Sequence, residues 1–153
     1  MAQKNVLILY YSGNGNTQRM AKAIAKGMSS SSTNMRVENV ENFETALLPD
    51  YDAIVLGSPT YFSNMAWQVK KMIDESMVHY RGGKLKGKVA GVFTSGGTKK
   101  DGKDCLETLE VALGHHHEMK VVGGILREDG EGVDEVEKRC MEYGKELAKE
   151  IGE

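Results

Sequence analysis

The fold of this chain is decided by the stretch Val6-Leu-Ile-Leu-Tyr-Tyr-Ser-Gly-Asn-Gly-Asn-Thr-Gln18. Its first residues are apolar or aromatic without interruption, which is typical of a strand buried on both faces of a parallel sheet. A polar loop follows, and residues 19–28 then show apolar side chains at helical spacing. We therefore predict a strand, a tight loop and a helix over residues 16–28. Such a loop lies where free backbone N–H groups and the helix dipole favour an anion.

The loop has the composition of an anion site that works without a cation. It does not end in Gly-Lys-Ser/Thr, so it is not a P-loop. Gly13 and Gly15 supply G-x-G, but Gln18 stands where a dinucleotide fingerprint needs its third glycine. What remains are the hydroxyls, amides and backbone N–H groups of residues 12–17. The alternative interpretation is an ordinary strand–helix connection with a Ser or Asn cap.

Composition limits the classes of protein to consider. The 153 residues suffice for a sizeable core, and we expect one domain over residues 1–153. A net charge of −2 indicates neither a nucleic-acid partner nor an anionic membrane surface. No apolar run is long enough for a membrane span and none resembles a leader, so a cytoplasmic location is expected. Cys105 and Cys140 lack cluster spacing, which favours reduced structural thiols, and no metal site is expected.

The rest of the chain alternates strand and helix patterns. Alternation of this kind predicts an α/β fold with a doubly wound parallel sheet. Residues 35–40 alternate apolar with polar, which suits an edge, whereas the continuously apolar strands suit the centre. With right-handed crossovers this predicts the strand order 2-1-3-4-5 and a ligand at the carboxyl ends of strands one and three. Strands are expected at 6–11, 35–40, 51–57, 89–94 and 119–125, and helices at 16–28, 65–77, 103–113 and 133–151.

Two further loops follow central strands and should meet the first loop at the same edge of the sheet. The loop over residues 58–64 carries Tyr61 and Phe62, which have little core to fill and suit a platform for a flat ring. The loop over residues 94–100 offers hydroxyls and backbone N–H groups that Gly96 and Gly97 make accessible. The alternative is a pair of ordinary loops, with Phe62 turned inward under the sheet.

The three loops resemble those of the flavodoxin superfamily. Residues 12–17 are similar to the phosphate loop of flavodoxins, with Asn14 where flavodoxins usually carry Thr. Residues 57–65 and 91–98 resemble the FMN loops of the flavodoxin-like NAD(P)H:quinone oxidoreductases of the WrbA type. Those enzymes usually have Arg and Gly where this chain has Tyr61 and Ser63, and they are longer between the second and third strands.

The resemblance implies a flavodoxin-like three-layer fold with a five-stranded parallel sheet and one non-covalently bound FMN. Residues 12–17 would hold the phosphate, residues 61–63 would flank the flavin, and residues 95–100 would close its polar rim. No catalytic acid–base residue is expected, because the flavin does the chemistry. The implied cofactor-binding residues are Ser12, Gly13, Asn14, Gly15, Asn16, Thr17, Pro59, Thr60, Tyr61, Phe62, Ser63, Ser95, Gly96, Gly97, Thr98, Lys99 and Lys100.

His115, His116 and His117 precede the last predicted strand. Adjacent histidines point in different directions and make a poor metal site, so the residues themselves favour a solvated turn. His-His-x-Met at 116–119 also matches the quinone reductases, and that resemblance implies that His117 contacts the substrate. Tyr80 stands where those enzymes carry a pocket tryptophan. The alternative for Tyr80 is a hydrophobic anchor of its loop.

Two functions stay open from the sequence. The preferred one is a flavodoxin-type redox protein that passes electrons to and from a partner protein through FMN. The other is a WrbA-type NAD(P)H:quinone oxidoreductase, whose partners are NAD(P)H and a quinone. A net charge of −2 is small for a carrier that docks through acidic patches. The second and third loops, Tyr80 and His117 favour the reductase, whereas Tyr61, Ser63 and the short length favour the carrier.

Overall fold

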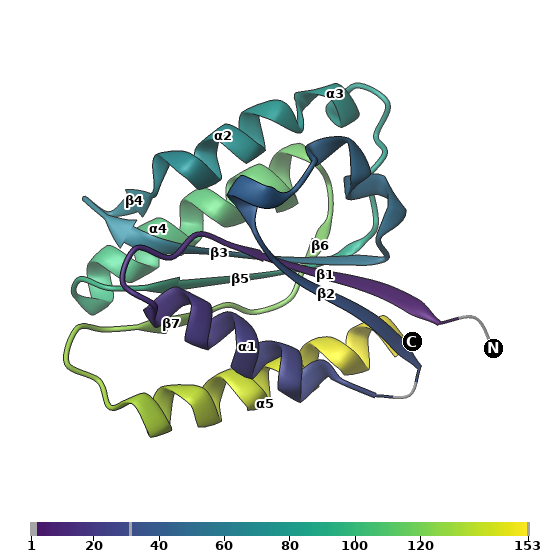
Figure 1. Ribbon diagram of the computed structural model, residues 1–153. Helices are drawn as coiled ribbons and strands as arrows, with labels where there is room; N and C mark the ends of the chain where they lie inside the picture. Colours follow the sequence, from purple (N-terminus) through teal and green to yellow (C-terminus); the bar gives the residue numbers. More distant parts are fainter. Residues whose placement is uncertain (1–2, 31, 153) are drawn as a thin grey trace.

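The computed structural model describes residues 3–30 and 32–152, and in it a mainly parallel sheet lies between two layers of helices (Figure 1). The carboxyl ends of the parallel strands all lie at one edge, because neighbouring strands run in the same direction. The order across the sheet is β2 (Thr33–Asn39), β1 (Lys4–Tyr10), β3 (Ala53–Tyr61), β5 (Val89–Ser95) and β6 (Lys120–Val121), with β7 (Ile125–Arg127) also paired to β5. This confirms the predicted order 2-1-3-4-5.

Helices cover both faces of the sheet, as the alternating pattern predicts (Figure 1). Helices α1 (Asn16–Met28) and α5 (Val133–Gly152) lie on one face. On the other face lie α2 (Trp67–Glu75), the short α3 (Met77–Tyr80) and α4 (Lys99–Glu110). Shorter helical segments are two 3-10 turns, Val40–Asn42 and Thr45–Asp50, and a π-helical turn, Val111–His116.

Strand β1 shows why a continuous apolar run becomes a central strand. Val6 and Ile8 belong to the core between the sheet and helices α1 and α5, whereas Leu7 and Leu9 belong to the core on the opposite face. All four side chains are completely buried. Since successive residues of a strand point to opposite faces, both cores need an apolar residue at every position. Truncating one of these leucines to Ala should cost about 2–5 kcal/mol of stability.

Two glycines bring α1 and α5 into close contact. A Cβ at Gly27 would lie 2.1 Å from the carbonyl oxygen of Met141, and a Cβ at Gly144 would lie 2.3 Å from that of Ile24. Any side chain at either position would push the helices apart, because carbon atoms do not approach oxygen so closely. The two glycines thus allow α1 and α5 to pack closely, whereas the amino end of α1 lies at the carboxyl edge because α1 follows β1.

The last strand differs from the prediction, which placed one strand over residues 119–125. The structure has two short strands, β6 and β7, separated by residues 122–124. The hydroxyl of Tyr143 accepts a hydrogen bond from the N–H of Val92 (3.1 Å) and donates one to the carbonyl of Val122 (2.6 Å). It therefore replaces ladder hydrogen bonds at the interruption. Because pairing resumes and continues to Arg127, the following residues reach the carboxyl edge of the sheet.

Other boundaries also differ by a few residues, the predicted helix over 65–77 is divided into α2 and α3, and two differences affect the predicted loops. Strand β3 continues through Tyr61 and turns back as β4 (Asn64–Met65), so the expected loop over residues 58–64 is mostly a β-hairpin. Helix α4 begins at Lys99 rather than Lys103. Cys105 and Cys140 are buried free thiols, as expected of structural cysteines. Within the described ranges, no helix is long and apolar enough to cross a membrane.

Candidate functional site

The loop between β1 and α1 is held by its own side chains. The Ser12 hydroxyl oxygen accepts hydrogen bonds from the N–H groups of Gly15 (3.0 Å) and Gln18 (3.3 Å). The side-chain oxygen of Asn14 accepts one from the N–H of Asn16 (3.2 Å). Gly15 has a φ of 95°, a backbone conformation that favours glycine. The first turn of α1 carries no acidic residue, so its amino end is electrostatically suited to an anion.

Tyr61, at the end of β3, lies over this loop. A Cβ at Gly13 would be 2.6 Å from the Tyr61 hydroxyl oxygen, so a larger residue at position 13 would displace the tyrosine. Tyr61 remains about half exposed, which leaves one side of the aromatic ring accessible. The first and second predicted loops are thus in close contact, with an aromatic ring beside the amino end of α1.

The three predicted loops meet around a hollow of about 210 Å³. Its volume is small, but it is open to solvent, and the residues that border it carry side-chain amides, hydroxyl groups and one carboxylate, that of Asp129. The structure therefore brings these parts of the sequence together, and their binding of a ligand stays a prediction. The lining residues are Asn14, Asn16, Pro59, Thr60, Tyr61, Ser95, Gly96, Gly97 and Asp129.

A second hollow of about 520 Å³ adjoins the first and shares Thr60 and Gly97 with it. Its other lining residues are Phe62, Ser63 and Asp101. Phe62 is fully exposed, so the alternative in which it turns inward under the sheet is wrong. An exposed aromatic ring at the rim of a hollow offers an apolar surface to a flat ligand.

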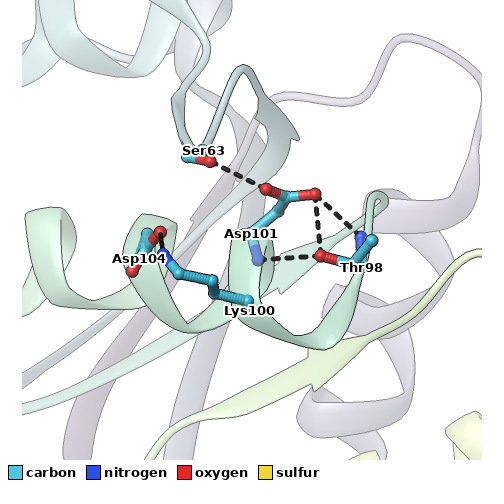
Figure 2. Close-up of polar contacts among 5 residues, drawn as sticks. All are labelled: Ser63, Thr98, Lys100, Asp101 and Asp104. Carbon is cyan, nitrogen blue, oxygen red and sulfur yellow. Dashed lines mark hydrogen bonds and ion pairs between the residues drawn. The ribbon is translucent and has the colours of Figure 1, made fainter.

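A single carboxylate connects this hairpin to α4, as Figure 2 shows. One Asp101 oxygen accepts from the Ser63 hydroxyl (2.8 Å), and the other accepts from the Thr98 N–H (3.1 Å) and the Thr98 hydroxyl (2.8 Å). Thr98 in turn accepts from the Asp101 N–H, which completes a capping box at the start of α4. These hydrogen bonds, first those from Thr98 and then that from Ser63, lower the pKa of Asp101.

Several predicted residues shape the site without lining either hollow. Ser12, Gly13, Gly15 and Thr17 belong to the first loop and the start of α1, where Thr17 is buried. In α4, Lys99 and Lys100 are exposed, and the Lys100 ammonium lies 2.8 Å from an Asp104 carboxylate oxygen on the helix surface. Thr98 is engaged with Asp101. The polar rim that the structure shows is therefore formed by residues 95–97 together with Asp101.

Tyr80 and His117 lie close to each other but far from the three loops. Their rings are 6.0 Å apart in a groove of about 770 Å³ between α2–α3 and α4 with its π-helical extension. Both residues precede strands, β5 and β6, and so lie at the amino edge of the sheet. A strand the length of β5, about 20 Å, separates that edge from the loops. Their role as substrate contacts stays a prediction.

The histidines are not simply a solvated turn. His115 and His116 are exposed, but His117 is buried, and its Nε2 lies 2.9 Å from the Ser76 hydroxyl oxygen. Burial lowers the pKa of His117, and the neighbouring His79 and His116 lower it further. The solvated-turn interpretation is therefore wrong for His117. The three rings point in different directions, and the described residues contain no group of three or more His, Cys, Asp or Glu side chains that could hold a metal ion.

Sequence reasoning missed two carboxylates. Asp129 lines the first hollow, and its N–H donates to the Gly97 carbonyl (3.0 Å), which ties the segment after β7 to the third loop. If the last strand had been predicted to reach Arg127, Asp129 would have been expected at the carboxyl edge, because parallel strands end at one edge of the sheet. Asp101 had a signal in the Thr98-x-x-Asp101 spacing of a capping box, but its contact with Ser63 is a tertiary one.

The residues present fit a phosphate-bearing aromatic cofactor. The first loop supplies hydroxyl, amide and backbone N–H donors at a helix amino end that lacks a carboxylate, which is the chemistry a bound phosphate needs. Tyr61 and Phe62 supply accessible aromatic surface beside it. Residues 95–97 supply backbone groups on the opposite side of the hollow.

Comparison with known proteins agrees with this arrangement. Residues 7–149 match a family described as flavodoxin domain. A Rhizobium meliloti protein named NAD(P)H dehydrogenase (quinone) 3 is 36% identical over 140 residues, covering 77% of this chain and 65% of that protein. The chain thus spans less than two thirds of the length of this relative. A Sinorhizobium fredii protein named NAD(P)H dehydrogenase (quinone) is 33% identical over 160 residues, covering 91% of this chain and 80% of that protein.

Solved structures show the same fold. A flavodoxin, WrbA-like protein from Agrobacterium tumefaciens superposes with a TM-score of 0.82 at 28% identity, covering 97% of this chain and 98% of its own. Oxidised Flavodoxin 1 from Bacillus cereus superposes with a TM-score of 0.82 at 24% identity, covering 95% and 98%, and supports the fold alone. The family match over nearly the whole chain, together with the three converging loops, shows that this protein belongs to the flavodoxin domain family of flavin-binding proteins.

Proposed function

We propose that this protein binds FMN non-covalently at the carboxyl edge of its sheet and transfers electrons through it. The observation that carries the proposal is the contact between the neutral, amide-rich loop at the amino end of α1 and the aromatic hairpin that follows β3. The loop offers the hydrogen-bond donors that a phosphate needs, and the hairpin offers aromatic surface for a flat ring. Membership of the flavodoxin family supports the same cofactor.

Each part of the site has a distinct role in this proposal. The N–H groups at the start of α1 and the side chains of Asn14, Asn16 and Thr17 bind the phosphate. Tyr61 and Phe62 flank the ring system and keep water from its faces. Asp129 accepts hydrogen bonds from the hydroxyls of the ribityl chain, and FMN, when bound, supplies the electron-transfer chemistry.

The phosphate assignment predicts that Thr17→Ala weakens FMN binding far more than riboflavin binding. A neutral-donor site holds its anion through several hydrogen bonds, and losing one bond to a charged group should raise the Kd for FMN on the order of tenfold. Riboflavin lacks the phosphate, so its Kd should change less than about twofold, within the usual effect of an uninvolved substitution. Both values can be measured by quenching of flavin fluorescence.

Thr108→Ala is a matched control, because it removes a threonine hydroxyl from α4 outside both hollows. It should leave both affinities unchanged. Equal losses of FMN and riboflavin affinity in Thr17→Ala would show that this loop does not hold the phosphate.

For the electron donor and acceptor, we propose NAD(P)H and a quinone, because two relatives carry the name NAD(P)H dehydrogenase (quinone). A redox carrier served by a partner protein is the alternative, and membership of the flavodoxin domain family is compatible with it. Anaerobic addition of NADH or NADPH to the FMN-loaded protein distinguishes them. Rapid bleaching of the yellow flavin band, followed by reoxidation with a quinone, supports the enzyme, whereas reduction only through a separate reductase supports the carrier.

A further inference from the structure

The hairpin after β3 turns through two residues that are poorly suited to its geometry. Tyr61 pairs with Asn64 across the hairpin, so Phe62 and Ser63 form a two-residue turn. Their φ angles are 51° and 63°, both in the left-handed region. Turns of this kind strongly prefer Asn-Gly, because residues with a Cβ are disfavoured at positive φ. The backbone of this turn is therefore strained.

The packing of the hairpin lies at its base, where Met65 contacts the core, and not at the two turn residues. The Phe62 side chain is fully exposed, so its hydrophobic surface gains no packing in the folded chain. Strained backbone persists only where surrounding structure holds it, and such positions cluster at ligand sites. Beyond the strand pairing of the hairpin, the side-chain contact made by the turn itself is the hydrogen bond from the Ser63 hydroxyl to Asp101, at 2.8 Å.

Asp101 is itself held in place by separate interactions. Its second oxygen accepts the N–H and the hydroxyl of Thr98, so the carboxylate is oriented by the amino end of α4 (Figure 2). The side chain cannot turn away from Ser63 without breaking the capping box. A rigid helix end thus presents a charged acceptor to the hairpin, and a hydrogen bond to a charged group is stronger than one between neutral groups.

We propose that Asp101 is a positioning residue that, through Ser63, holds the Phe62–Ser63 turn in its strained conformation beside the cofactor site. One oxygen of the carboxylate caps α4 and the other fixes the hairpin, so the second and third loops move as one unit. The geometry of the second hollow, which Phe62, Ser63 and Asp101 line together, depends on this contact. That the second hollow receives part of the flavin rests on the proposed function, whereas the support of the turn by Asp101 does not.

The test compares two substitutions that both remove the Ser63 hydroxyl. Ser63→Ala loses the hydrogen bond and keeps the strain, whereas Ser63→Gly loses the bond but adopts a positive φ freely. In the cofactor-free protein, amide hydrogen exchange of Tyr61 and Asn64, which pair across the hairpin, should accelerate on the order of fivefold in Ser63→Ala, which corresponds to one hydrogen bond. Exchange in Ser63→Gly should stay within about twofold of the wild type, because glycine relieves the strain.

A second variant tests whether Asp101 acts on the turn through Ser63 or only by capping α4. Asp101→Asn should also accelerate exchange at Tyr61 and Asn64, and it should have no further effect on the hairpin in a Ser63→Ala background. A residue that acts only by stabilising α4 would give additive effects. Additive effects, or Ser63→Ala exchange equal to that of the wild type, would overturn the proposal.

Titration with FMN then reports on function separately. Ser63→Ala should raise the Kd for FMN more than Ser63→Gly does, since only the alanine variant lets the turn relax. If the wild type itself fails to bind FMN, the proposed function is wrong, and the exchange data on the cofactor-free protein still decide whether Asp101 braces the turn. If FMN binds and the two variants have equal affinity, the turn does not shape the site and that part of the proposal is wrong.

Discussion

The β1–α1 loop and the β3–β4 hairpin lie side by side and depend on different parts of the chain. In the β1–α1 loop, Ser12 and Asn14 supply the acceptors, and all their partners lie within the next six residues. Its one positive φ in the described structure falls on Gly15. In the hairpin, positive φ falls on Phe62 and Ser63, and the acceptor that Ser63 uses is Asp101, 38 positions away.

This difference teaches that two loops of one site can be organised at different levels. The first loop can form as soon as its own residues are in place, because its hydrogen bonds are local. The hairpin reaches its conformation only when α4 is docked and capped. Strain of this kind is tolerated where tertiary structure supplies a compensating contact. Substitutions in the two loops should therefore have different effects on stability. Three predictions test this difference.

The largest expected effect comes from giving the hairpin the residues that its geometry prefers. Phe62→Asn combined with Ser63→Gly should raise the free energy of unfolding by about 2 kcal/mol, because left-handed backbone costs about 1–2 kcal/mol at each residue with a Cβ, less the lost hydrogen bond. Urea unfolding of the cofactor-free protein measures the change. Ser63→Gly alone should give a smaller change, and a double variant no more stable than the wild type would mean that the turn is not strained.

A smaller effect is expected from Ser12→Ala, which removes the acceptor of two amides in the β1–α1 loop. The free energy of unfolding should fall by about 1 kcal/mol, the usual net contribution of a hydrogen bond within a protein. Ser29→Ala is the matched control, because its hydroxyl bonds the Ala25 carbonyl at the exposed far end of the same helix. That control should change stability by less than about 0.5 kcal/mol. Equal effects would mean that Ser12 does not organise the loop.

The smallest expected effect is the pH dependence of the hairpin. The pKa of Asp101 is lowered from its ordinary value of 3.8, so the carboxylate supports the hairpin above that pH and loses this contribution as the pH falls through the lowered pKa. Amide chemical shifts of Phe62 and Ser63 should therefore change as the pH is lowered below about 4. They should change less in Asp101→Asn and remain as in the wild type in Asp104→Asn, whose carboxylate instead pairs with Lys100. Identical titrations in all three proteins would contradict the proposal that the Asp101 carboxylate holds the hairpin.

Much of the fold was accessible from sequence because burial leaves a clear pattern. The continuous apolar run in β1 identified a central strand, since both of its faces contact core. The last strand was harder, because its interruption at residues 122–124 is compensated by Tyr143, a residue from another element. Because the predicted strand ended at residue 125, Asp129 was not included in the predicted site.

For the loops as well, the sequence indicated positions at the edge of the sheet but not contacts between distant residues. The residues that line the first hollow include members of all three predicted loops, because the carboxyl ends of parallel strands must meet. Tyr80 and His117 entered the candidate set through resemblance alone. The structure places them at the far end of a groove that runs along α2 and α4 from the β3–β4 hairpin, a position that no local pattern in the chain specifies.

By itself, the sequence determined the strand order, the position of the carboxyl edge and the local hydrogen bonds of the β1–α1 loop. These follow from periodicity and from hydrogen bonds between near neighbours, which local residues specify. Only the tertiary structure decided that Tyr61 lies over Gly13, that Asp129 reaches the hollow and that Asp101 holds Ser63. Those contacts join residues far apart in the chain, and their geometry exists only after the strands have paired and the helices have packed.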